Sequence, residues 1–129
     1  MGTAIDSPEQ VVRRFCDAVT GMDAQALRPF FAEDVVYHNI PMEPAVGLDA
    51  TIEALAMFMG MCTAMRFDIL HLAADGDAVL TERLDVFTIG GAAAPFEVMG
   101  VFEVAHGRIT AWRDYFDLAK VTAQMSGDG

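Results

Sequence analysis

The feature that most constrains this chain is a change in the spacing of its apolar residues near Met65. Before Met65, apolar side chains recur every three or four positions, which is the period of an amphipathic helix. After it, apolar and polar residues alternate, as in a strand with one buried face. Helices followed by a run of antiparallel strands predict an α+β fold. We expect one strongly curved sheet, a cone with helices packed on its concave face, enclosing an apolar pocket.

The first half of the chain predicts three helices. The first begins at residues 7–10, where a serine, a proline and a glutamine suit the N-cap, the first helical position and the closing position of a capping box. It is expected to end near Gly21, and Asp23 is expected to cap a shorter second helix. The third begins near Leu48. Its apolar stripe is Ile52, Leu55, Ala56 and Met59.

One short strand is expected among the helices and a run of longer strands after them. The short strand covers residues 35–40, between a turn at 33–34 and a loop at 41–47 that contains two prolines and a glycine. Residues 89–94 are expected to form a flexible loop. The longer strands run from Met65 to a hairpin turn at 75–77, and then over 78–88, 96–104 and 108–117.

The size and the apolar content of the chain point to a pocket or an interface. Its 129 residues suffice for a single domain with one sizeable core, in which residues 1–6 and 126–129 are expected to be flexible. Hydrophobic residues make up 53% of the chain. A chain this short has too little interior for all of them, so we expect an internal pocket, an apolar dimer interface, or both.

Charge and residue types argue against several classes of partner. The net charge of −11 disfavours binding to nucleic acid or to an anionic membrane surface. No apolar run reaches the roughly 18 residues of a membrane-spanning helix, and the start lacks the pattern of a secretory signal. Cys16 and Cys62 fall in apolar helical patterns, which predicts reduced core thiols in a cytoplasmic protein. The three histidines are scattered, so a metal site is not expected.

Five polar residues fall on strand faces that could meet. Side chains alternate along a strand, so Arg83 and Asp85 share one face, and Tyr37 and Asn39 share one face of the short strand. Asp114 lies on the last strand. Burying an arginine and an aspartate is unfavourable unless they are paired. We therefore expect Arg83 to bridge Asp85 and Asp114 at the bottom of the apolar pocket, since a guanidinium can donate to two carboxylates.

Such a bridge could supply both an acid and a base. Desolvation favours the protonated form of one carboxyl group, and hydrogen bonds from Tyr37 and Asn39 favour the ionised form of the other. Carboxyl groups separated in this way can act as a general acid and a general base. The alternative for Arg83 and Asp85 is a structural ion pair on a solvated face. For Asp114 the alternative is a residue that merely flanks a strand. For Tyr37 and Asn39 the alternative is a structural role near a turn.

At these residues the chain resembles the limonene-1,2-epoxide hydrolase family. This family belongs to the ketosteroid-isomerase and nuclear-transport-factor-two-like superfamily of α+β cones. The resemblance extends from about Ser7 to Leu118. The segments that carry it are VYHNIP at 36–41, TERLDV at 81–86, GVF at 100–102 and ITAWRDYFD at 109–117.

The resemblance implies a homodimeric, cofactor-independent hydrolase that adds water to a small apolar, terpene-like or cyclic epoxide and releases a vicinal diol in one step. It implies that Asp114 deprotonates a water held by Tyr37 and Asn39, that Asp85 protonates the epoxide oxygen, and that Arg83 links both carboxyl groups. The apolar wall that it implies is Phe58, Cys62, Phe87, Phe96, Val98 and Phe116.

Two other functions remain open from the sequence. An isomerase, dehydratase or cyclase of the same cone fold would move a proton beside a carbonyl group. That chemistry needs one base and an oxyanion donor, and does not need Arg83 between two aspartates. A non-catalytic domain that binds small molecules has no reason to keep three buried charges, so solvent exposure of these residues would favour it.

Overall fold

A six-stranded mixed sheet forms the centre of the computed structural model, which describes residues 6–125. Its strands lie in the order β2-β1-β6-β5-β4-β3. The helices are α1 (Pro8–Ala18), α2 (Leu48–Met59) and α3 (Leu118–Met125), and 3-10 helices cover Val19–Gly21 and Gln25–Phe30. The strands are β1 (Phe31–Asn39), β2 (Ala45–Val46), β3 (Ala64–Asp75), β4 (Ala78–Ile89), β5 (Ala92–Ala105) and β6 (Arg108–Tyr115).

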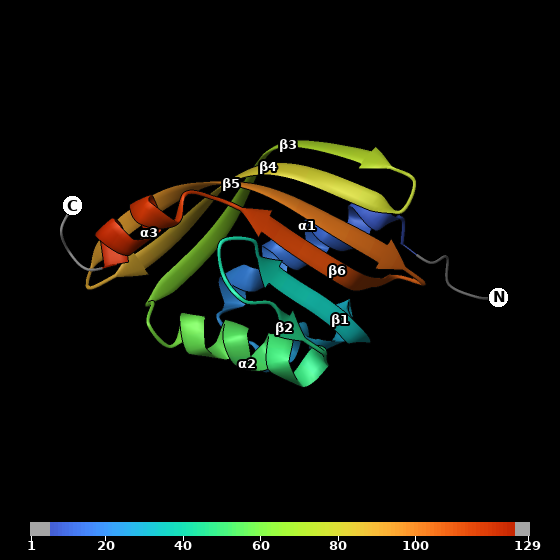
Figure 1. The fold of residues 1–129 in the computed structure, drawn as a ribbon, viewed down its shortest axis with the longest axis horizontal. Coiled ribbons are helices and arrows are strands. Elements are labelled where there is room, and N and C mark those ends of the chain that lie inside the picture. The colour runs from blue at the N-terminus through green and yellow to red at the C-terminus, as the bar shows by residue number, and fades with distance from the viewer. Residues whose placement is uncertain (1–5, 126–129) are drawn as a thin grey trace.

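The sheet is curved, and the helices lie against it as an α+β cone requires (Figure 1). In this view α1 crosses behind the sheet, α2 lies below β1 and β2, and α3 lies at the end where β4 turns into β5. The predicted fold class is therefore confirmed. All neighbouring strands pair antiparallel except β1 and β6, which are parallel.

The N-terminal helices form for the reasons that the sequence indicated. Ser7 Oγ accepts a hydrogen bond from the Gln10 backbone N–H at 3.2 Å, and Gln10 Oε1 accepts from the Ser7 N–H at 2.8 Å, so the capping box is complete. The chain leaves α1 through a 3-10 turn that ends at Met22, which takes a left-handed φ of 57°. Asp23 Oδ1 then accepts from the backbone N–H groups of residues 25 and 26, and so caps the second helix, a 3-10 helix.

Several predicted boundaries are wrong. Residues 33–34 lie within β1 and not in a turn; their side chains are exposed beside an irregular stretch of the β1–β6 pairing. The predicted loop at 41–47 contains β2, which pairs with β1. Residues 89–94 are not a flexible loop: Gly90 and Gly91 take positive φ in a tight hairpin turn, and β5 begins at Ala92.

Two further corrections concern the helices. In α2, Ala56 is exposed and does not belong to the buried stripe, whereas Thr51 is buried. The helix α3 was not predicted. Its start explains why β6 stops at Tyr115: Asp117 Oδ1 accepts hydrogen bonds from the N–H groups of Ala119 at 3.0 Å and Lys120 at 3.3 Å. The predicted flexibility at 126–129 and at 1–5 lies outside the described residues.

The core is an aromatic cluster between α1 and the sheet. Trp112 of β6 is fully buried and is surrounded by Phe15, Phe31 and Phe102, with ring centroids 5.0 to 6.3 Å away. Both cysteines are free; Cys16 is buried and Cys62 is half-buried. In the described part of the chain no helix is both long enough and apolar enough to cross a membrane.

Candidate active site

Arg83 lies between Asp85 and Asp114 and donates two hydrogen bonds to each. Its Nε and Nη2 donate to the two oxygens of Asp85 at 3.0 and 2.8 Å, and its Nη1 and Nη2 donate to the two oxygens of Asp114 at 3.1 and 2.9 Å. Nη1 also donates to Thr81 Oγ1 at 3.1 Å. All five N–H groups of the guanidinium are therefore used. Arg83 is only 1% exposed, Asp85 3% and Asp114 4%.

Gly100 makes this bridge possible. Arg83 is on β4 and Asp114 is on β6, and β5 runs between these two strands. Gly100 of β5 pairs with Thr81 on one side and with Asp114 on the other, so it lies directly beneath the guanidinium. A Cβ atom at position 100 would overlap Arg83 Nη1 and Asp114 Oδ1. The missing side chain leaves the space through which Arg83 reaches the second aspartate.

The two aspartates have different surroundings. Trp112 Nε1–H donates to Asp114 Oδ1 at 2.8 Å, and no second donor of this kind reaches Asp85 from the described part of the chain. Burial raises the pKa of Asp85 to about 6, although hydrogen bonds from Arg83 oppose this shift. Burial alone would lower the pKa of Arg83, but the two carboxylates hold it well above its ordinary value. Arg83 therefore keeps its charge in the site.

Tyr37 and Asn39 lie at the end of β1, beside β6. Asn39 is the register partner of Asp114, and its Nδ2 donates to the Tyr37 hydroxyl group at 3.1 Å. Burial raises the pKa of Tyr37 above its ordinary value, so the hydroxyl group keeps its proton. Within residues 6–125 neither side chain donates directly to Asp114, contrary to expectation; Trp112 is the neighbour that does so.

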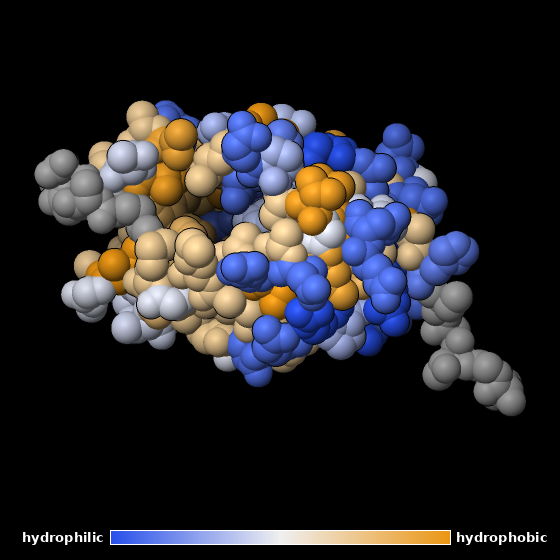
Figure 2. Space-filling model, turned by 60° about the horizontal axis from the view of Figure 1, so that its bottom comes forward, coloured by the Kyte–Doolittle hydropathy of each residue, from blue (hydrophilic) through white to orange (hydrophobic). Residues whose placement is uncertain are grey.

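Four polar side chains of the bridge and of β1 line an apolar cavity of about 420 Å³. They are Tyr37, Asn39, Asp85 and Asp114. The wall contains five of the six predicted residues, namely Phe58, Phe87, Phe96, Val98 and Phe116. Cys62, the sixth, is not among the lining residues and packs against the core instead. Figure 2 shows this face of the molecule hollowed, with apolar residues beside the hollow.

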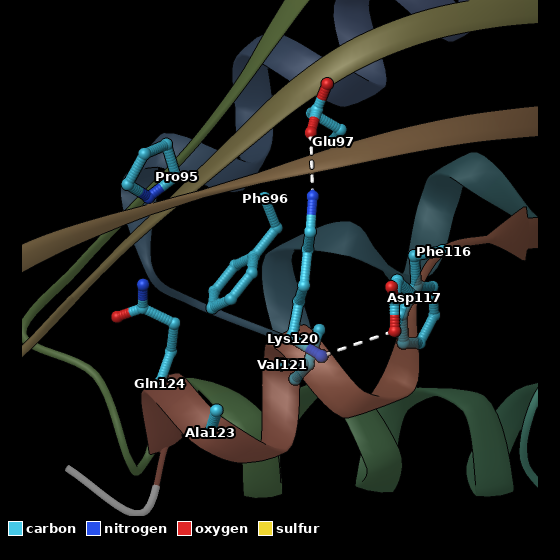
Figure 3. A pocket seen from close by; sticks show the side chains of 9 residues that line it. All are labelled: Pro95, Phe96, Glu97, Phe116, Asp117, Lys120, Val121, Ala123 and Gln124. Carbon is cyan, nitrogen blue, oxygen red and sulfur yellow. Dashed lines mark hydrogen bonds and ion pairs between the residues drawn. The ribbon is translucent and has the colours of Figure 1, made fainter. Parts of the chain in front are cut away.

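The helix α3 closes one side of the cavity. Its Leu118 and Val121 line the cavity, and a second groove of about 380 Å³ lies between the helix and β5. Figure 3 shows Phe96 and Val121 between this strand and α3, and Lys120 reaching to Glu97, whose Oε1 is 3.4 Å from the Lys120 Nζ. Phe96, Phe116 and Val121 line both spaces, so these three side chains separate the groove from the cavity.

Two polar partners of the bridge were missed at the sequence level. Thr81 lies two residues before Arg83 and Trp112 lies two residues before Asp114, so each shares a strand face with the group that it contacts. The spacing of two residues along a strand could have predicted both contacts from the sequence. Within residues 6–125 no group of three or more histidine, cysteine, aspartate or glutamate side chains is placed to hold a metal ion.

Comparison with known proteins assigns the family. The model described as the limonene-1,2-epoxide hydrolase catalytic domain matches residues 6–126. The chain belongs to the limonene-1,2-epoxide hydrolase family. The predicted resemblance and the predicted enzyme class, an epoxide hydrolase, are thus confirmed.

Individual relatives agree with this assignment. The epoxide hydrolase EphG of Mycobacterium tuberculosis is 39% identical over 107 residues, which are 83% of this chain and 71% of EphG. A solved structure of an LEH-like epoxide hydrolase from M. tuberculosis has a TM-score of 0.77 at 34% identity, covering 93% of this chain and 96% of that one. A protein with a ketosteroid isomerase-like fold from Catenulispora acidiphila has a TM-score of 0.77 at 27% identity, covering 94% and 95% of the two chains.

Proposed function

We propose that this enzyme adds water to a small apolar epoxide and releases a vicinal diol in one step, without a cofactor. The observation that carries the proposal is the Asp85–Arg83–Asp114 bridge, whose two carboxyl groups line an apolar cavity. Asp114 acts as the base, Asp85 acts as the acid, and Tyr37 and Asn39 hold the attacking water. The burial of all three charges also supports catalysis over a non-catalytic binding domain, for which exposed charges were expected.

The two carboxyl groups answer two chemical problems. Water is a poor nucleophile until a base removes its proton, and an alkoxide is a poor leaving group until an acid protonates it. Asp114 takes a proton from water as the water oxygen attacks a ring carbon. The bond between that carbon and the epoxide oxygen breaks, and the epoxide oxygen receives the proton of Asp85. The raised pKa of Asp85 supports this role, because the group holds its proton up to about pH 6.

Arg83 keeps the charge of the site balanced during this transfer. Before the reaction Asp114 is ionised and Asp85 is protonated; afterwards the two have exchanged states. The guanidinium contacts both carboxyl groups, so one positive charge faces one negative charge at the beginning and at the end. An isomerase or cyclase that acts beside a carbonyl group has no need of this symmetry.

The substrate class follows from the wall of the cavity. Aromatic and aliphatic side chains line most of a space of about 420 Å³, which suits a terpene-like or cyclic epoxide. The net charge of −11 disfavours an anionic substrate. A neutral, compact and apolar epoxide therefore fits best.

The decisive experiment is a single turnover in oxygen-18 water with enzyme in excess of a cyclic terpene epoxide. Direct attack by water places the heavy oxygen in the diol of the first turnover and none in the protein. A covalent ester would instead give an unlabelled first diol and a labelled Asp85 or Asp114, detected by mass spectrometry of the peptides. That second result would refute the one-step mechanism.

The proposal includes a homodimer. Apolar side chains remain exposed on the face of the sheet opposite the cavity; among them Met99 is 49% and Tyr115 46% exposed. These two are register partners on β5 and β6, so they form a continuous apolar surface. A second copy of this chain would cover it, in keeping with the high apolar content of the sequence.

A further inference from the structure

Trp112 contacts two members of the proposed machinery, and we propose that it is a positioning residue for both. Through its indole N–H it orients the base Asp114, and through its ring it fixes the water-holding Tyr37. The inference rests on the proposed function, because it assigns Trp112 a task in the same reaction. Trp112 itself is not among the residues that line the cavity.

The first contact determines which oxygen of Asp114 is free to react. Oδ1 accepts hydrogen bonds from Trp112 Nε1 at 2.8 Å and from Arg83 Nη1 at 3.1 Å. Oδ2 accepts only one, from Arg83 Nη2 at 2.9 Å, among the described residues. A carboxylate oxygen has two lone-pair sites. Trp112 therefore completes the bonding of Oδ1 and leaves the free lone pair, and the proton transfer from water, to Oδ2.

The second contact sets the position of the tyrosine. Trp112 on β6 is the register partner of Tyr37 on β1 and of Phe102 on β5. The three rings are stacked across the three strands: Trp112 lies 4.1 Å from Tyr37 and 5.4 Å from Phe102, each at 18° between planes. The indole is thus held between two rings. The Tyr37 ring cannot shift toward β6 while the indole is in place.

Both contacts act from a rigid support. Trp112 is 0% exposed, and Phe15 packs its edge against the indole at 5.0 Å and 77°. A buried N–H that donates to a buried carboxylate forms a charge-assisted hydrogen bond, which is stronger than one between neutral groups. The aromatic cluster of the core therefore holds Trp112 in place, and Trp112 in turn holds both Asp114 and Tyr37 in position.

The chain contains one tryptophan, which allows a test that changes this contact alone. Growth of a tryptophan auxotroph on 3-benzothienylalanine replaces the indole N–H with sulfur and keeps the ring shape. We expect kcat to fall about 10- to 100-fold, the range for loss of a hydrogen bond to a charged group, while KM stays within about twofold. Trp112→Phe should show the same loss.

A packing control separates positioning from stability. Phe31→Leu disturbs a ring stacked on Trp112 and touches no polar group of the site. It should lower the melting temperature and leave kcat close to that of the wild type. An unchanged kcat in the benzothienyl enzyme, or a loss that appears in KM, would overturn the proposal.

A measurement without substrate distinguishes failure of this inference from failure of the proposed function. The fluorescence emission of the single tryptophan should differ between the wild type and Asp114→Asn, because an amide replaces the carboxylate that the indole N–H contacts. If no epoxide is hydrolysed but the emission differs in this way, the proposed function fails and the contact stands. If epoxides are hydrolysed but the emission of the two proteins is the same, the role of Trp112 is refuted.

Discussion

Residue type alone does not distinguish the two aspartates of this site; their donors do. Among residues 6–125, Asp114 accepts from Arg83 and from the indole of Trp112, whereas Asp85 accepts from Arg83 alone. Asp85 is also buried enough for its pKa to rise to about 6. Two identical side chains on neighbouring parts of one bridge can thus take opposite parts in acid–base catalysis.

The raised pKa of Asp85 predicts a loss of stability as the pH rises. A carboxyl group whose pKa is higher in the folded than in the unfolded state stabilises the fold when it is protonated. This stabilisation is lost as the pH rises from the pKa of the unfolded state to the pKa of the folded state. For Asp85 the window runs from about 4 to about 6. At about 1.4 kcal/mol per pH unit this amounts to about 3 kcal/mol. The measurement is the free energy of unfolding in urea, from pH 4 to pH 7, for the wild type and for Asp85→Asn. The stability of the wild type relative to the variant should fall by this amount as the pH rises and should then stay constant.

The assigned roles predict which substitutions abolish diol formation. Asp85→Asn and Asp114→Asn keep the side-chain volume and remove the acid or the base, so each should lower kcat about 10²- to 10⁴-fold. Tyr37→Phe should be milder, because water keeps other holders. Product formation from a cyclic epoxide would be followed by gas chromatography, with circular dichroism as the control for folding. Near-normal turnover by Asp85→Asn would mean that another group supplies the proton.

At the scale of the element, alternation along the strands was the most informative part of the sequence. It placed Arg83, Asp85 and Asp114 on faces that meet, and the structure joins them within 3.1 Å. What it missed has physical causes. The helix α3 has only 8 residues, too few for a helical period to stand out from the strand pattern before it, and it buries none of its described side chains fully. The sequence predicts a flexible loop at the Gly90–Gly91 turn because glycine is common both in loops and in tight hairpin turns.

The geometry of β5 predicts that Gly100→Ala disrupts the site. The added methyl group would overlap Arg83 Nη1 and Asp114 Oδ1 and push one of the buried charges from its partner. Breaking a buried ion pair costs about 3–5 kcal/mol. We expect a loss of this size in urea unfolding, together with loss of diol formation. Gly21→Ala is the matched control: position 21 has open space and no positive φ, so stability and activity should change little.

At the scale of the whole molecule, the side of the sheet away from the cavity carries the proposed dimer interface. Met99→Lys places a charge among exposed apolar side chains of β5 and β6 and should shift sedimentation from dimer to monomer at micromolar concentration. Val46→Lys, at an exposed apolar residue of β2, should leave the dimer intact. A wild type that sediments as a monomer would contradict the prediction.

The parallel pairing of β1 with β6 also decides when, during its own synthesis, this enzyme can first work. Translation delivers Tyr37 and Asn39 before β2, β3, β4 and β5, and only after these the strand that sets Asp114 beside them. Such a pairing between distant segments forms slowly, because chain entropy is lost before any contact compensates for it. The nascent chain therefore has the proposed acid before it has the proposed base. On the proposed mechanism it stays inactive until β6 has left the ribosome, and a premature stop before residue 108 should yield an inactive protein.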